Sequence, residues 1–214
     1  MSILWRQQVI THSSNNSAHL PLILASTSTF RHELLSRLGI PFTCFAPNVD
    51  ETPLAGEAVY DLVTRLSRLK AAAACETYPA ALVIGSDQVA YCRGKVLGKP
   101  GHFAAAVEQL QWMSGQTVQF LTGLCVLNTA TRQAETTIVE VEVQFRALTV
   151  AQIEAYLRKE SALACAGSFR SEGLGIALTE AIRCDDPTAL MGLPLITLVK
   201  LLNNLGFDVL TVST

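Results

Sequence analysis

The chain has 214 residues, of which 50% are hydrophobic and 16% are charged, and its formal net charge is −2. About a quarter of the residues in an ordinary soluble domain are charged, so this composition predicts a large buried core or an oligomer interface and excludes disorder for nearly all of the chain. The slight acidity, without a run of Lys or Arg, argues against a nucleic-acid polymer as partner but is compatible with a single nucleotide. No apolar stretch reaches the roughly 18 residues that span a bilayer, so we expect no membrane segment.

The first 19 residues differ from the rest of the chain. They contain one arginine, Arg6, and a polar tract at 11–17, which is not a secretory signal. We therefore expect residues 1–19 to form a flexible extension and residues 20–214, which contain no linker-like stretch and no repeat, to form a single domain. Six cysteines without a C-x-x-C pair and four histidines without ligand spacing argue against a disulfide framework or a zinc site.

Hydrophobic periodicity in the first part of the chain predicts strands that alternate with helices. In chain order, the pattern favours a strand at 20–25, a helix at 30–38, a strand at 42–46, a helix at 57–78 and a strand at 80–85. The last of these strands is a continuous apolar run, which is typical of a parallel strand covered on both faces.

The second part of the chain has a different pattern. Here we predict a hairpin at 89–98 that turns at Arg93-Gly94, a helix at 103–113, β segments at 118–127 and 137–145, a helix at 149–159, a glycine-rich stretch at 166–175 and a helix at 193–205. Apolar and polar residues alternate along 139–145, as in an antiparallel strand with one wet face. Together the elements predict an α/β fold with a mixed sheet.

The first group of candidate functional residues lies where the first strand meets the first helix. A helix N-terminus offers unpaired N–H groups, the hydroxyls of Ser26 and Ser28 add donors, and Arg31 supplies a positive fork one turn into the helix. These residues suit a phosphate. The alternative is that Ser28 is only an N-cap and Arg31 only a solvated surface residue.

Two carboxylates form the second group. Asp87 directly follows the most apolar strand, and ligands of open α/β sheets gather beyond the carboxyl ends of strands. A carboxylate there can bind a divalent cation or act as a general base, and Glu51 in the polar loop after the second strand can complete a metal site. An ordinary turn acid is the alternative for Glu51.

Two lysines can neutralise phosphate. Lys70 emerges at the edge of the apolar face of its helix, where it either snorkels to solvent or contacts phosphate. Lys99 lies in a turn within Gly98-Lys99-Pro100, and its alternative is a plain turn lysine. The glycine-rich stretch matches neither G-x-G-x-x-G nor the P-loop, so a dinucleotide cofactor and a Walker-type ATPase are not supported.

Jointly, these residues resemble the Maf family of nucleotide pyrophosphatases. The resemblance runs from about Leu22 to Gly206, and its order and spacing are more specific than any single motif. The motifs are Leu24-Ala25-Ser26-Thr27-Ser28 with Arg31, Val49-Asp50-Glu51, Arg68-Leu69-Lys70-Ala71, Gly85-Ser86-Asp87-Gln88-Val89, Gly98-Lys99-Pro100, Cys165-Ala166-Gly167-Ser168-Phe169 and Gly192-Leu193-Pro194.

The resemblance implies a cytoplasmic, often dimeric enzyme that cleaves a nucleoside triphosphate between its α- and β-phosphates with a divalent cation such as Mg²⁺ or Mn²⁺. It further implies a twisted mixed sheet with flanking helices around a deep nucleotide-binding cleft. Carried over by position, Asp87 is the proton acceptor, Glu51 helps Asp87 with the metal, and four residues hold phosphates: Ser26, Arg31, Lys70 and Lys99.

Three positions depart from the commoner Maf pattern: Phe30 replaces an arginine, Gln88 a threonine and Glu172 a glutamine. These departures resemble the subfamily that prefers 7-methyl-GTP over dTTP and UTP, although a tryptophan is expected at position 30. A cationic purine favours an aromatic face and a nearby carboxylate, which Phe30 and Glu172 can supply. The alternatives are a hydrophobic staple for Phe30 and a solvated loop acid for Glu172.

Two other functions remain open at this point. A dTTP/UTP pyrophosphatase of the same fold differs only in its base pocket. A nucleotide-sensing regulator of septum formation, without catalysis, is the alternative of another class. A pure binder needs no general base together with a metal carboxylate, so Asp87, Glu51, Lys70 and Lys99 argue against the regulator.

Overall fold

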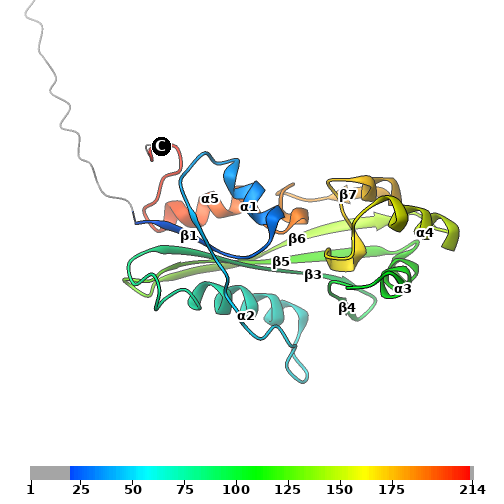
Figure 1. The fold of residues 1–214 in the computed structure, drawn as a ribbon, viewed down its shortest axis with the longest axis horizontal. Helices are drawn as coiled ribbons and strands as arrows, with labels where there is room; N and C mark the ends of the chain where they lie inside the picture. The colour runs from blue at the N-terminus through cyan, green and yellow to red at the C-terminus, as the bar shows by residue number, and fades with distance from the viewer. Residues whose placement is uncertain (1–19, 213–214) are drawn as a thin grey trace, which may run out of the picture.

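A computed structural model of the protein describes residues 20–212. Its seven strands form a single mixed sheet in the order β2-β1-β3-β5-β6-β7, with β4 paired to β3 (Figure 1). β1 pairs in parallel with β2 and β3, whereas the other pairs are antiparallel. The strands are β1 (Leu22–Ala25), β2 (Thr43–Phe45), β3 (Leu82–Cys92), β4 (Lys95–Leu97), β5 (Thr117–Asn128), β6 (Ala134–Phe145) and β7 (Thr179–Arg183). The predicted α/β class with a mixed sheet is therefore confirmed.

Helices cover both faces of this sheet. α2 (Val59–Ala72) lies on one face, and the other face carries α1 (Thr29–Ser36) and α5 (Leu195–Asn204) at one end and α3 (Phe103–Met113) and α4 (Val150–Lys159) at the other. Successive side chains of a strand point to opposite faces. On β5, accordingly, Leu121 packs under α2, whereas Phe120 packs with α3 and α4 and Leu124 with α5.

β3 is longer than its sequence predicts. The polar run Ser86-Asp87-Gln88 looks like a strand end, yet β3 continues through it to Cys92 and pairs with β5 along its length. Asp87 therefore lies inside a strand, and the prediction that it follows the carboxyl end of its own strand is wrong. The polar run is tolerated because its backbone is fully paired in the ladder while its side chains make polar contacts on both faces of the sheet.

Several other boundaries agree closely with the periodicity. The helix at 103–113 and the turn at Arg93-Gly94 occur where predicted, and both turn residues have positive φ, as a two-residue hairpin requires. The helix at 57–78 is shorter, ending at Ala72, and β7 within 179–183 was not predicted. The glycine-rich stretch contains two short 3₁₀ turns, Ala166–Ser168 and Leu174–Leu178. The extension expected at 1–19 lies outside the described residues.

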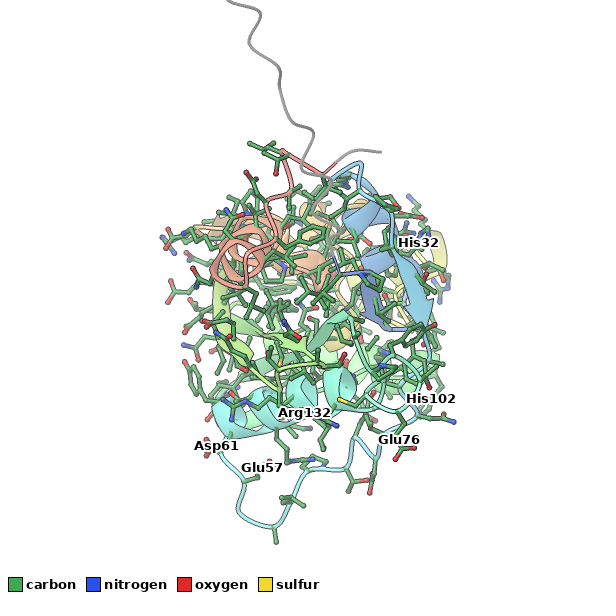
Figure 2. All side chains as sticks on the ribbon, turned by 90° about the vertical axis from the view of Figure 1, so that its left-hand side faces the viewer. His32, Glu57, Asp61, Glu76, His102 and Arg132 are labelled. Carbon is green, nitrogen blue, oxygen red and sulfur yellow. The ribbon has the colours of Figure 1, made fainter. Side chains whose placement is uncertain are left out.

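His32 and His102 are exposed at the periphery (Figure 2), and no cluster of three or more His, Cys, Asp or Glu within 20–212 has the arrangement of a metal site. All six cysteines are free thiols, three of them buried. Among the helices of the described residues, none combines the length and apolarity that a membrane crossing needs.

Candidate active site

A pocket of about 310 Å³ lies beside the start of α1. Its walls come from four parts of the chain that are distant in sequence: the start of α1, the loop after β2, the segment 164–172 and the turn at 190–192. It lies where β1 ends, so the topology places it at the carboxyl edge of the parallel strands. Nine of the ten predicted site residues line it: Ser26, Ser28, Phe30, Arg31, Glu51, Lys70, Gln88, Lys99 and Glu172.

The first wall is the junction of β1 with α1. Ser28 is the N-cap of α1, since its hydroxyl accepts a hydrogen bond of 3.4 Å from the backbone N–H of Arg31, and the buried Ser26 hydroxyl accepts one of 3.1 Å from the N–H of Ser28. The capping role of Ser28 is thus confirmed, and both hydroxyls line the pocket. The expected phosphate-binding role is compatible with this position.

Arg31 is fixed by a distant backbone carbonyl. Its Nε donates a hydrogen bond of 2.8 Å to the carbonyl oxygen of Gly192, and the Ser86 hydroxyl donates another of 2.8 Å to the same oxygen. Arg31 is therefore not a freely solvated side chain. Burial lowers the pKa of its guanidinium, while the charges of Asp87 and Glu51 raise it, with a net lowering.

Lys70 lies at the floor of the pocket between two carboxylates. Its Nζ is 2.6 Å from Oδ1 of Asp87 and 2.7 Å from Oε1 of Glu51. Lys70 is only 5% exposed and Asp87 only 6%, so the ion pair between these two residues is buried. Lys70 therefore does not snorkel to solvent. Asp87, the one predicted residue that does not line the pocket, lies directly behind Lys70.

Two glycines let α2 approach the sheet closely enough for this contact. A Cβ at Gly85 of β3 would collide with the carbonyl of Ser67, and a Cβ at Gly123 of β5 would collide with the carbonyl of Val63. Because neither strand carries a side chain there, the helix packs directly on the strand backbones. Lys70, one turn further along α2, then reaches Asp87 on β3.

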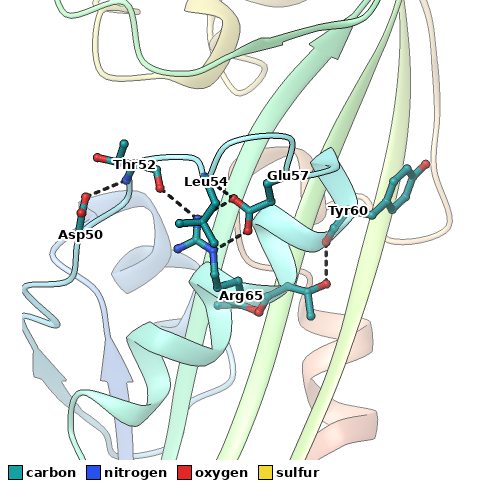
Figure 3. Close-up of polar contacts among 8 residues, drawn as sticks. Asp50, Thr52, Leu54, Glu57, Tyr60 and Arg65 are labelled. Atoms are coloured by element: carbon teal, nitrogen blue, oxygen red, sulfur yellow. Dashed lines mark hydrogen bonds and ion pairs between the residues drawn. The ribbon is translucent and has the colours of Figure 1, made fainter.

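A second contact holds the loop that carries Glu51. Arg65 on α2 binds Glu57 through both carboxylate oxygens, with Nη2 to Oε2 at 2.7 Å, and its Nη2 also donates to the carbonyl of Thr52 at 3.1 Å (Figure 3). Glu57 accepts a further hydrogen bond from the N–H of Leu54. The hydrogen bonds to Arg65 hold the pKa of Glu57 well below its usual range, at about 2. These hydrogen bonds of the Arg65 guanidinium hold the loop just after Glu51 against α2.

The charges around Glu51 favour its ionised form. Burial raises the pKa of its carboxyl, but the hydrogen bond and charge of Lys70, with the charges of Lys99 and Arg31, lower it by more. Lys99 is itself exposed and lines the pocket. Three cations and two carboxylates therefore converge, and their net positive charge suits a polyanionic ligand such as a triphosphate.

Gln88 lines the pocket but is engaged with the fold. Its amide nitrogen donates to the carbonyls of Ala189 and Leu190 and to the hydroxyl of Thr122, at 2.8, 3.2 and 3.0 Å. The amide therefore holds the backbone of the 189–191 turn, which forms the pocket rim. A direct contact between Gln88 and the base of a bound nucleotide stays a prediction.

Phe30 belongs to the first wall, and Glu172 belongs to the facing segment at 164–172. Arg170, which had no predicted role and does not itself line the pocket, contacts both of them. The Arg170 guanidinium lies 5.5 Å from the centroid of the Phe30 ring, and its Nε is 3.2 Å from Oε1 of Glu172. Its Nη1 is 2.7 Å from Oε1 of Glu160, and Oε2 of Glu160 accepts a hydrogen bond from the N–H of Leu174. Glu172 is thus neither isolated nor simply solvated.

Other functional contacts were also missed. The Gly192 carbonyl binds Arg31, and the Cys165 side chain, whose thiol pKa is raised to about 11 by burial, lines the pocket. The only signal that could have indicated Arg170 is its place two residues before Glu172 in the glycine-rich stretch. No local pattern indicates that a backbone carbonyl will accept a hydrogen bond from a side chain 161 residues away.

Comparison with known proteins agrees with this geometry. The family model described as Maf-like protein matches residues 21–205. A 7-methyl-GTP pyrophosphatase of Nitrosococcus oceani is 53% identical over 189 residues, which cover 88% of this chain and 95% of the relative. The proteins of the same name from Pseudoalteromonas translucida and Thiobacillus denitrificans are 51% and 54% identical, over 91% and 89% of this chain and 96% and 94% of theirs. With the family's motifs gathered around one pocket and nearly the whole chain matched, this protein belongs to the Maf family.

Proposed function

We propose that this chain hydrolyses 7-methyl-GTP to 7-methyl-GMP and diphosphate in a deep cleft that contains the described pocket. The observation that carries the reaction class is the convergence of Lys70, Arg31, Lys99 and Glu51 at one pocket, with the carboxylate of Asp87 directly behind Lys70. The name of the relatives above, at about half identity, supports the choice of substrate.

In the proposed reaction, water attacks the α-phosphorus and the bond from that phosphorus to the α–β bridging oxygen breaks. The bridging oxygen leaves with diphosphate, and Asp87 accepts the proton of the water. Lys70 holds Asp87 through Oδ1, which orients the carboxylate. Arg31, Lys99 and the serine hydroxyls bind phosphate oxygens, and this neutralisation is worth most where charge develops in the transition state.

The two carboxylates are candidates for holding a divalent cation. Glu51 and Asp87 each bring one oxygen to the ammonium of Lys70, so a cation held by both would take the place that this ammonium occupies. Mg²⁺ is commonly held by one or two carboxylates together with substrate phosphates, so two carboxylates without a third match its preference. Glu51 and Asp87 would hold the cation, and when bound it would neutralise phosphate charge.

A diphosphate-release assay over methylated and standard nucleotides tests the substrate. We expect the highest kcat/KM for 7-methyl-GTP; a higher value for dTTP or UTP would make this chain a pyrophosphatase for those nucleotides. Nucleotide binding without any turnover would instead support the septum regulator.

Asp87→Asn and metal removal test the chemistry. The variant should lower kcat by at least ~10²-fold, as loss of a general base does, and a chelator should abolish turnover reversibly. Activity that survives either treatment would contradict the mechanism.

Two further parts of the proposal rest on the family resemblance. We propose that the protein acts in the cytoplasm and that it is a homodimer. Light scattering of the purified full chain tests the second part, since a homodimer has twice the 23.1 kDa mass of one chain.

A further inference from the structure

Asp186 is a buried carboxylate to which the proposed reaction gives no role. It is 2% exposed and lies between β7 and α5, outside the set of residues that line the pocket. Its Oδ1 accepts from the N–H and the hydroxyl of Thr188, at 3.3 and 2.8 Å, and its Oδ2 accepts from the N–H and the hydroxyl of Thr197, at 3.0 and 3.2 Å. Four hydrogen bonds thus stabilise its buried charge.

These hydrogen bonds join the turn at 186–192 to the start of α5. The N-cap position of α5 is Pro194, which has no side-chain acceptor, so the helix lacks a local cap. Asp186 instead accepts from the N–H of Thr197, and the Thr188 hydroxyl accepts from the N–H of Leu195 at 2.7 Å. The outer side of the turn is therefore fixed to the helix.

The inner side of the same turn holds residues of the active site. At its end, Gly192 adopts a φ of +95°, and its carbonyl accepts from Nε of Arg31 and from the hydroxyl of Ser86, both at 2.8 Å. The Ala189 carbonyl accepts from Gln88. The turn therefore contacts α5 on one side and residues of the pocket on the other.

From this arrangement, the geometry points to Asp186 as a positioning residue for Arg31. By fixing the turn, Asp186 fixes the Gly192 carbonyl, and this carbonyl orients the plane of the Arg31 guanidinium. A guanidinium binds phosphate as a planar fork, so its orientation decides how many phosphate oxygens it can reach. This inference rests on the proposed function, which assigns Arg31 to the phosphates.

A double-mutant cycle tests the inference. Asp186→Asn keeps the size of the side chain but turns an NH₂ group toward one of the two donor pairs. We expect it to lower kcat/KM by about 10- to 100-fold, the range for a small misplacement of a catalytic group. In an Arg31→Ala background the same change should have almost no further effect, because the group that Asp186 positions is absent.

Asp208→Asn is the matched control. Asp208 is exposed, and its carboxylate accepts from the N–H of Leu210 at 3.0 Å, away from the pocket. Asp208→Asn should leave kcat/KM unchanged in the wild-type and in the Arg31→Ala background. Should Asp186→Asn not fold, Thr197→Val removes a single hydroxyl contact and enters the same cycle.

Calorimetry with inorganic diphosphate measures phosphate binding without any contribution from the nucleotide base. Asp186→Asn should weaken diphosphate binding by about tenfold or more, and not in the Arg31→Ala background. Equal losses in both backgrounds, or a lower melting temperature with unchanged kcat/KM and diphosphate affinity, would leave Asp186 a purely structural residue. A wild-type protein that binds diphosphate but does not turn over 7-methyl-GTP would refute the proposed substrate and leave the positioning role standing.

Discussion

Lys70 contributes to the fold as well as to the site, whereas Lys99 contributes to the site alone. From the sequence, both lysines were expected to act on phosphate, and no contribution to the fold was predicted for either. The burial of Lys70 against Asp87 changes this expectation, because its removal leaves a buried carboxylate without a counter-ion. The exposed Lys99 has no such effect.

Lys70→Met and Lys99→Met therefore form a matched pair. Both should lower turnover. Lys70→Met should also lower the free energy of unfolding by about 3 kcal/mol at neutral pH, while Lys99→Met should change it by less than about 0.5 kcal/mol. Denaturant unfolding and diphosphate release measure the two effects. Equal unfolding midpoints would show that the Lys70–Asp87 pair adds nothing to stability.

Base selection is also argued at individual residues. Phe30→Arg combined with Gln88→Thr and Glu172→Gln should lower kcat/KM for 7-methyl-GTP and raise it for dTTP and UTP, with a combined change of up to ~10⁴-fold. The introduced arginine would lie beside the guanidinium of Arg170. Adding Arg170→Gln should therefore improve the variant by removing like-charge repulsion.

Gln88→Thr alone is the control for this series. Because the Gln88 amide holds the pocket rim, the single change should lower kcat/KM for all three nucleotides to a similar extent. If the combined variant keeps the wild-type ranking of the nucleotides, these positions do not select the base.

At the scale of elements, the loop after β2 depends on α2. Arg65 holds Glu57 and the Thr52 carbonyl, and so determines where Glu51 meets Lys70. Glu57→Gln should lower kcat/KM several-fold and increase amide hydrogen exchange at 50–57, because a neutral amide binds the guanidinium more weakly. Glu76→Gln, an exposed acid after the same helix, is the control and should change neither.

The same contact predicts a pH dependence of stability. The folded-state pKa of Glu57, about 2, lies below the ordinary value of 4.5, so the ionised form favours folding. Its contribution is complete above about pH 4.5 and is lost as the pH falls through about 2. The difference in unfolding free energy between wild type and Glu57→Gln should shrink over this window. A constant difference would contradict the assigned pKa.

At the scale of the whole molecule, segments from two ends of one sheet face meet at the pocket. α1 and α5 pack at one end of the sheet face, α3 and α4 at the other, and the segments 26–31 and 164–172 face each other across the pocket. A nucleotide that spans the pocket must contact both segments.

Binding of 7-methyl-GMP with diphosphate should therefore slow amide hydrogen exchange in 26–31 and in 164–172 together. Residues 134–140 of β6, outside the pocket, serve as the internal control. At a ligand concentration of 100 times Kd, the ligand should add about 2.7 kcal/mol to the unfolding free energy. Protection of only one wall would place the nucleotide elsewhere.

Local patterns in the sequence determined most of the elements, while the family resemblance supplied part of the candidate site. The helix at 103–113, the turn at Arg93-Gly94 and the alternation along β6 follow from periodicity and turn chemistry, which depend on neighbouring residues. The predicted site residues came together for a related reason: most of them lie at element ends or in loops, where side chains need not enter a core.

Only the tertiary structure decided how these residues pair. β3 continues through Ser86-Asp87-Gln88 because β5 satisfies its backbone, and a single strand cannot show that partner. Lys70 meets Asp87 because two glycines on separate strands admit α2, and Arg31 is oriented by a carbonyl 161 residues away. Periodicity records which face of an element is buried, whereas the identity of the group packed against that face depends on the fold of the whole chain.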